Sequence, residues 1–163
     1  MPHAASGTVG DRLVEALSGE GVRHVFGIPG DFTLALNATV ESRMQWVGTL
    51  DEQGAGFAAD AYARLHGLGC VMATWGPGGL KLVNSTAQAW SENSPVVVVS
   101  GAPGLAERAG DPLLHHRVKG FDTQRRVMEQ VTAMAVEIDD PATASERIAR
   151  AIATAKRAHK PVY

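Results

Sequence analysis

The sequence of 163 residues has the length of a single domain, and its apolar content of 45% is ordinary for a domain with a packed core. The formal net charge of −2 gives no basic excess, so we expect neither nucleic acid nor a membrane as a partner. The longest apolar run, residues 95–99, is far shorter than the roughly 20 residues of a membrane-spanning helix.

Two further features of the sequence bear on the cellular location of the protein. Residues 1–7 lack the cationic stretch and apolar run of a secretory signal, so we expect none. The single cysteine, Cys70, excludes an internal disulfide and a multi-cysteine zinc site, and it is expected to be a small buried residue in a strand. A cytoplasmic location fits these features.

Short β-branched runs alternate with longer helical stretches along the chain, which predicts βα units and an α/β fold around a parallel sheet. Thr8 and Asp11 resemble a helix N-cap with its capping box, and glycines at 19 and 21 end that helix. In chain order, the pattern predicts helix 8–19, strand 24–28, helix 32–40, strand 45–50, helix 52–65, strand 69–75, a helix from the turn 76–79 to about residue 93, strand 95–100, a long loop 101–120, helix 122–129, strand 131–136, helix 141–157 and the opening of a strand at 161–163.

Chemistry is expected beyond the carboxyl ends of the strands, where open parallel sheets bind ligands. Four segments reach that edge: residues 27–31, 51–52, 74–79 and the loop after residue 100. They carry Asp31, Glu52 and the adjacent pair His115 and His116. Each also has a simpler explanation. A carboxylate in a first helical turn is stabilised by the helix dipole, and a histidine pair in a loop is commonly solvated surface.

The glycine-rich turn at residues 76–79 is ambiguous by itself. It lacks the Lys-Ser/Thr pair of a phosphate-binding P-loop and the spacing of a dinucleotide fingerprint, so it is either an ordinary strand-to-helix turn or a place where the backbone approaches a ligand closely. A metal site in this chain is not expected, since three or four converging ligands are needed and the sequence offers two adjacent histidines with scattered carboxylates.

Taken in order, five blocks resemble the thiamine diphosphate-dependent 2-keto-acid decarboxylases of the pyruvate, indolepyruvate and phenylpyruvate type. They are FGIPGDF at residues 26–32, EQGAGFAADAYAR at 52–64, TWGPGG at 74–79, AWSENSPV at 89–96 with SGAPG at 100–104, and LLHH at 113–116. The resemblance runs from about residue 8 to residue 163 and implies a three-layer, flavodoxin-like pyrimidine-binding domain. The combination of Asp31 with His115 and His116 points to the decarboxylase branch, whereas Pro77 looks more like the synthase branch.

The resemblance also implies residue roles. Glu52 is expected to exchange a proton with N1′ of the cofactor's aminopyrimidine ring, and Asp31, His115 and His116 are expected to relay protons on the substrate side. The residues expected to contact the cofactor are Glu52, Pro29, Thr74, Pro77 and Gly78.

The domain that binds the diphosphate and Mg²⁺ in the family has a Gly-Asp-Gly…Asn signature, which does not occur in residues 1–163. We therefore expect a single pyrimidine-binding domain that needs a diphosphate-binding domain or subunit, within a homodimeric or homotetrameric enzyme. The expected reaction converts a 2-keto acid, aromatic or branched, to an aldehyde and CO₂. The alternatives are an acetolactate-synthase-like carboligase domain, a non-catalytic pairing or regulatory domain, and a generic flavodoxin-like binding domain.

Overall fold

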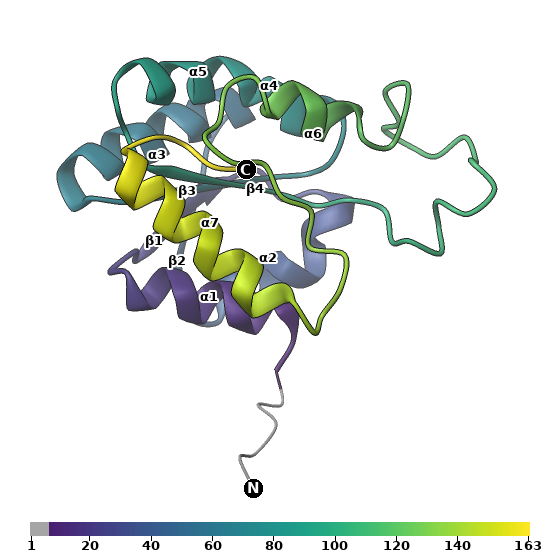
Figure 1. The fold of residues 1–163 in the computed structure, drawn as a ribbon, viewed down its shortest axis with the longest axis horizontal. Helices are drawn as coiled ribbons and strands as arrows, with labels where there is room; N and C mark the ends of the chain where they lie inside the picture. Colours follow the sequence, from purple (N-terminus) through teal and green to yellow (C-terminus); the bar gives the residue numbers. More distant parts are fainter. Residues whose placement is uncertain (1–6) are drawn as a thin grey trace, which may run out of the picture.

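The computed structural model describes residues 7–163, which form a four-stranded parallel sheet between two layers of helices (Figure 1). The strand order is β2-β1-β3-β4. The strands are β1 (His24–Gly27), β2 (Gln45–Gly48), β3 (Gly69–Ala73) and β4 (Val96–Ser100). The expectation that residues 1–6 carry no secretory signal lies outside the described residues.

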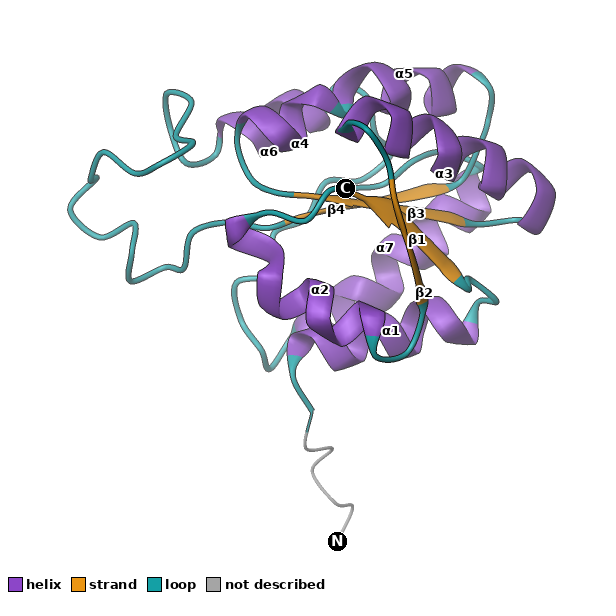
Figure 2. Cartoon of the chain, turned by 180° about the vertical axis from the view of Figure 1, so that it is seen from behind, coloured by secondary structure: helices purple, strands orange, loops and turns teal. Residues whose placement is uncertain are grey.

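Helices cover both faces of the sheet, as the two opposite views show (Figure 2). One layer holds α1 (Val9–Gly19), α2 (Leu34–Glu41) and α7 (Ala144–Ala158). The other holds α3 (Glu52–His66), α4 (Pro77–Lys81), α5 (Val83–Ser91) and α6 (Thr123–Met128). The predicted α/β three-layer sandwich with a flavodoxin-like parallel sheet is confirmed. No helix within residues 7–163 has the length and apolar character needed to cross a membrane.

Each face of the sheet has its own apolar core, because successive side chains of a strand point to opposite faces. Cys70 and Met72 of β3 belong to the core beneath α1 and α7, whereas Val71 and Ala73 belong to the core beneath α3 and α5. All five residues of β3 are buried, as expected for the middle of a parallel sheet. Cys70 is buried in this strand, which confirms the prediction, and burial raises the pKa of its thiol to about 12.

The helix ends follow the predicted signals. The Thr8 hydroxyl accepts a hydrogen bond from Asp11 N–H at 3.1 Å, and the Asp11 carboxylate accepts one from Thr8 N–H at 2.8 Å, so the capping box of α1 is formed. Gly67 ends α3 in the left-handed region at φ +87°. These signals explain why the predicted and observed limits of α1 and α3 differ by only one residue at an end.

Several predicted elements differ from the observed ones by one to three residues at an end, and two differ in kind. The helix expected from residue 77 to about 93 is broken at Leu82, whose N–H donates to the oxygen of Gly79, three residues back. The strand expected at 131–136 is irregular. Its backbone shares only a few hydrogen bonds with residues 161–163, such as Val136 N–H to Tyr163 O at 2.8 Å. Val162 in turn forms a single parallel bridge with Val97 of β4, so residues 161–163 extend the sheet by one short segment.

Candidate functional site

The candidate residues gather at the topological switch point of the sheet. The chain leaves β1 toward β2 on one side and returns to β3 on the other. Open parallel sheets bind ligands at the strand ends beside such a switch point. Residues 28–31 follow β1, and residues 74–78 follow β3. The segment before α3 and the long loop after β4 reach the same edge (Figure 1).

Glu52 is the first residue of α3, directly after the helix N-cap. Asp51 caps the helix by accepting a hydrogen bond from Gly54 N–H at 2.7 Å, which fixes the direction in which α3 starts. The Glu52 side chain is 17% exposed, and its Oε2 lies 3.8 Å from Lys81 Nζ. Glu52 is thus a shielded carboxylate that is close to one cation and is held by the start of a long helix.

Gly78 lets the Glu52 carboxylate and the Thr74 side chain pack directly against the backbone at the start of α4. A Cβ atom at this position would lie 3.0 Å from Glu52 Oε1 and 2.9 Å from Thr74 Cγ2, so any other residue would crowd both side chains. Gly30 meets the other side of Thr74, since a Cβ there would lie 2.4 Å from Thr74 Cβ. The two glycines let the turns after β1 and β3 close around Thr74, which is buried.

Thr74 also connects Glu52 and Gly78 to Asp31. Its hydroxyl donates a hydrogen bond to Asp31 Oδ1 at 3.1 Å, and Phe32 N–H donates to the same oxygen at 3.0 Å. Partial burial acts to raise the pKa of the Asp31 carboxyl. The two hydrogen bonds and the positive charge that His116 and His115 can carry act the other way, and the net pKa of Asp31 lies below its ordinary value.

The long loop brings both histidines to Asp31. His115 Nε2 lies 3.3 Å from Asp31 Oδ2, and His116 Nδ1 lies 3.8 Å from Asp31 Oδ1. The two imidazole rings stack on each other with centroids 3.7 Å apart. His115 is largely exposed, whereas His116 Nδ1 is shielded from solvent and makes no hydrogen bond within the described residues.

The loop is held against the sheet edge by its own contacts, although its middle projects well clear of the helical layers (Figure 2). A Cβ at Gly76 would lie 2.1 Å from the carbonyl oxygen of His116, so the glycine turn and the histidine loop touch through their backbones. The Arg117 guanidinium donates to the carbonyls of Pro112 and Lys119 at 2.7 Å each. It also lies 4.6 Å from the ring centroid of Phe121.

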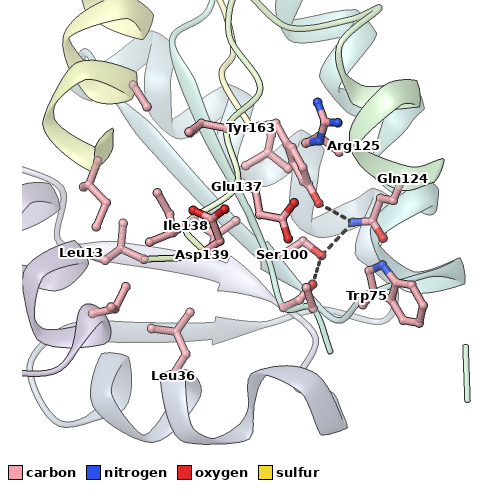
Figure 3. A pocket seen from close by; sticks show the side chains of 18 of the residues that line it. Leu13, Leu36, Trp75, Ser100, Gln124, Arg125, Glu137, Ile138, Asp139 and Tyr163 are labelled. Atoms are coloured by element: carbon pink, nitrogen blue, oxygen red, sulfur yellow. Dashed lines mark hydrogen bonds between the residues drawn. The ribbon is translucent and has the colours of Figure 1, made fainter. Parts of the chain in front are cut away.

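Gln124 is a structural residue that the sequence did not single out (Figure 3). Its Oε1 accepts a hydrogen bond from Gly76 N–H at 2.6 Å, and its Nε2 donates to Ser100 Oγ at 2.7 Å and to the Tyr163 hydroxyl at 3.0 Å. One buried side chain therefore joins the turn after β3, the end of β4 and the segment 161–163. A glutamine in the first turns of a short helix carries no sequence signal for such a position.

Figure 3 also shows the pocket beside this cluster, with a volume of about 450 Å³. Apolar side chains of α1, α2, α7 and β4 line it together with residues of the segments 101–105 and 136–141, and Glu137 and Arg108 form an ion pair there at 2.5 Å. Asp31, Glu52, His115 and His116 do not line it. The catalytic candidates therefore lie at the strand ends, outside this pocket.

The structure thus brings the predicted residues to one edge in two connected groups, with Thr74 between them. Glu52, Thr74 and Gly78 form one group, and Asp31, His115 and His116 form the other. Pro29 is exposed in the turn after β1, and Pro77 is exposed at the first position of α4.

Comparison with known proteins identifies the family. The family described as "Thiamine pyrophosphate enzyme, N-terminal TPP binding domain" matches residues 7–135. This chain belongs to that family. An indole-3-pyruvate decarboxylase of Azospirillum brasilense is 42% identical over 156 residues, which are 94% of this chain and 29% of the relative. Pyruvate decarboxylase 2 of Nicotiana tabacum is 38% identical over 160 residues, which are 96% of this chain and 26% of the relative. The chain therefore spans between a quarter and a third of these two relatives.

The cofactor of this family is thiamine diphosphate, and the site fits its pyrimidine ring on physical grounds. Without a side chain at Gly78, the Glu52 carboxylate and the Thr74 methyl group lie directly against the glycine backbone. A glycine backbone also lets a flat heterocycle approach closely. A shielded carboxylate beside it can hold a hydrogen bond to a ring nitrogen.

Proposed function

We propose that this chain is the pyrimidine-binding part of a thiamine diphosphate-dependent decarboxylase that converts a 2-keto acid to an aldehyde and CO₂. The observation that carries the proposal is the pairing of two groups across Thr74: the Glu52 carboxylate beside Gly78, and the cluster of Asp31 with His115 and His116. The names of the relatives, indole-3-pyruvate decarboxylase and pyruvate decarboxylase, support the reaction class.

In this proposal Glu52 holds and returns a proton at N1′ of the pyrimidine ring. Its place in the first turn of α3 fixes the carboxylate through the capped backbone, and its low exposure keeps most water away from the shared proton. Thr74 and Gly78 face the ring, with Pro29 and Pro77 in the flanking turns. When bound, the cofactor supplies the nucleophilic carbon and the electron sink for loss of CO₂.

The second group handles protons on the substrate side. Asp31 is kept ionised by its hydrogen bonds from Thr74 and the Phe32 backbone, so it can orient both histidines. Histidine titrates near neutral pH, which suits His115 and His116 for giving a proton to the product carbon and for taking one back. The exposure of His115 lets it exchange protons with solvent.

The finer parts of the proposal concern the substrate and the assembly. The substrate in this proposal is an aromatic or branched keto acid, and the name of the indole-3-pyruvate decarboxylase relative supports the aromatic choice. The diphosphate and Mg²⁺ are held by a second domain or subunit, and the complete enzyme is a cytoplasmic homodimer or homotetramer. An acetolactate-synthase-like carboligase would instead join the product to a second carbonyl compound, and a non-catalytic pairing domain would release no CO₂.

The test is Glu52→Gln in the enzyme assembled with its diphosphate-binding domain. Loss of proton transfer at N1′ should lower kcat by at least about 10²-fold. Glu41→Gln is the control, because Glu41 is an exposed residue at the end of α2. CO₂ release and product analysis with pyruvate and an aromatic keto acid provide the readout. Wild-type turnover by Glu52→Gln would remove this residue from the mechanism, and an acyloin or acetolactate product would favour the carboligase.

A further inference from the structure

We propose that Asp31, His115 and His116 form a binding site for a divalent transition-metal ion of the Zn²⁺ type. The sequence predicted no metal site because it showed only two adjacent histidines; the third ligand arrives through folding. Ligand atoms of the three residues all lie within 4.8 Å of one another. We also propose that a bound ion inhibits the enzyme. This second part rests on the proposed function, whereas the binding of the ion does not.

The spacing of the ligand atoms suits a tetrahedral ion. Zinc bonds to histidine nitrogen and carboxylate oxygen at about 2.0–2.2 Å, which places tetrahedral ligands about 3.3–3.5 Å apart. The separation of His115 Nε2 from Asp31 Oδ2 is 3.3 Å, which matches this spacing. His116 Nδ1 lies 3.8 Å from the other carboxylate oxygen, Oδ1, so His116 has to move closer to share the ion. Small side-chain rotations would bring three ligands onto one ion and leave a fourth position for water.

The ligands are also held in place by surrounding groups. Asp31 Oδ1 accepts hydrogen bonds from Thr74 Oγ1 and Phe32 N–H, which fix the carboxylate and leave Oδ2 turned toward His115. Such outer hydrogen bonds raise metal affinity by orienting the ligands. His116 Nδ1 has no hydrogen-bond partner within residues 7–163, although it is shielded from water and faces Asp31. A metal ion would satisfy this nitrogen.

The donor set selects the ion. Two imidazole nitrogens with one carboxylate oxygen suit Zn²⁺, Cu²⁺, Ni²⁺ and Co²⁺. Mg²⁺ prefers oxygen ligands in octahedral geometry, so this cluster should not retain it. The proposed site is therefore distinct in chemistry from a Mg²⁺ site for the diphosphate.

In the proposed enzyme, an ion here would occupy the groups that handle substrate protons. A Zn²⁺ ion takes up the nitrogen lone pairs that His115 and His116 need as bases. Because His115 and His116 lie on the substrate side in the proposed function, the ion and the substrate would exclude each other. We therefore expect reversible inhibition that competes with the substrate.

The binding test uses the 163-residue chain, freed of metal, in calorimetric titration with Zn²⁺ at neutral pH. One ion per chain should bind, and Asp31→Asn, His115→Ala and His116→Asn should each weaken binding by about tenfold or more. Asparagine at 116 tolerates the positive φ of 63° found there, and each variant is checked by circular dichroism. His159→Asn is the control, since His159 is an exposed histidine with a positive φ of 51° outside the cluster.

Two further measurements sharpen the test. Co²⁺ should give the visible absorption of a tetrahedral centre, and the three variants should lack this absorption. Titration with Mg²⁺ should release the same heat from the wild type and from Asp31→Asn, because Mg²⁺ does not bind at this cluster. The proposal is overturned if Zn²⁺ fails to saturate a single site, or if the three variants bind it as tightly as the His159→Asn control.

In the assembled enzyme, Zn²⁺ should raise the apparent KM for the keto acid with little change in kcat, and dilution should reverse the effect. An active enzyme that binds Zn²⁺ at these residues without inhibition would overturn the inhibitory part. An assembled protein without decarboxylase activity would instead contradict the proposed function while the Zn²⁺ titration still decides the metal site.

Discussion

The two groups of the candidate site are positioned in different ways. Glu52 belongs to the first turn of a 15-residue helix, and its backbone direction is set by the Asp51 cap. His115 and His116 belong to a loop without regular secondary structure, where Asp111, His116 and Lys119 all have positive φ. One group is held by local hydrogen bonds, the other by contacts between distant parts of the chain. The histidine side should therefore be the more sensitive to distant substitutions.

Gly76→Ala should have the largest effect on stability, because it disrupts the backbone contact between the turn after β3 and the histidine loop. Gly76 has φ +76° and ψ −129°, a conformation that costs other residues about 1–3 kcal/mol. An added Cβ would also lie 2.1 Å from the carbonyl oxygen of His116. We expect a large fall in the free energy of unfolding, measured by urea denaturation, together with faster proteolytic cleavage of the loop 101–120.

Gly110→Ala is the matched control for this prediction. Gly110 has almost the same φ, +77°, but a Cβ there would meet nothing within 4 Å. It tests backbone strain without the collision, so its effect should be smaller than that of Gly76→Ala by about 1–3 kcal/mol. Equal effects in the two variants would mean that the histidine loop does not pack against the glycine turn.

Gln124→Leu should have the next largest effect, because it removes the hydrogen bonds that join three segments at the sheet edge. Leucine has a similar size, but it leaves the buried Gly76 N–H without its acceptor, which costs about 1–3 kcal/mol. Thermal unfolding followed by circular dichroism measures the change. The control is Gln130→Ala. Gln130 is exposed just beyond α6, so this variant should unfold at nearly the same temperature as the wild type. A fully stable Gln124→Leu protein would show that water or a rearranged turn replaces the lost acceptor.

The same contrast explains what could be predicted from the sequence. Helix 52–65 was predicted almost to its observed limits, Glu52–His66, because local signals mark both of its ends. Strand 69–75 was predicted two residues too long. Thr74 and Trp75 are buried like strand residues, but the backbone has already left the ladder to enter the turn. The break at Leu82 could not be predicted, since an apolar residue there also fits a continuous helix.

Contacts across the fold were harder to predict. The approach of His115 and His116 to Asp31 came from the family resemblance, because no local pattern links residues 84 positions or more apart. The position of Gln124 was missed for the same reason: its partners Gly76, Ser100 and Tyr163 are separated from it by 48, 24 and 39 positions. The sequence showed which strand ends carry polar groups, whereas side-chain contacts between those ends required the structure.

Asp51→Ala should have the smallest effect, and it tests how firmly the glutamate side is held. The hydrogen bond from Gly54 N–H and the nearby Lys81 ammonium hold the pKa of Asp51 below its ordinary value of 3.8. A carboxyl group with a lowered pKa stabilises the folded state above its ordinary pKa, and that contribution is lost as the pH falls through the folded value. The wild type should therefore melt at a higher temperature than Asp51→Ala at neutral pH, and the difference should become smaller below about pH 4.

Asp51→Asn separates the cap from the charge in this comparison. Asparagine is also a good N-cap, so this variant keeps the acceptor for Gly54 N–H but loses the attraction to Lys81. Its melting temperature should stay near that of the wild type at neutral pH and change less than the wild type on acidification. If Asp51→Asn melts as early as Asp51→Ala, the charge on Asp51 rather than the cap stabilises the start of α3. The backbone hydrogen bond would then not be what fixes Glu52, and the contrast between a locally held glutamate and a distantly held histidine pair would weaken.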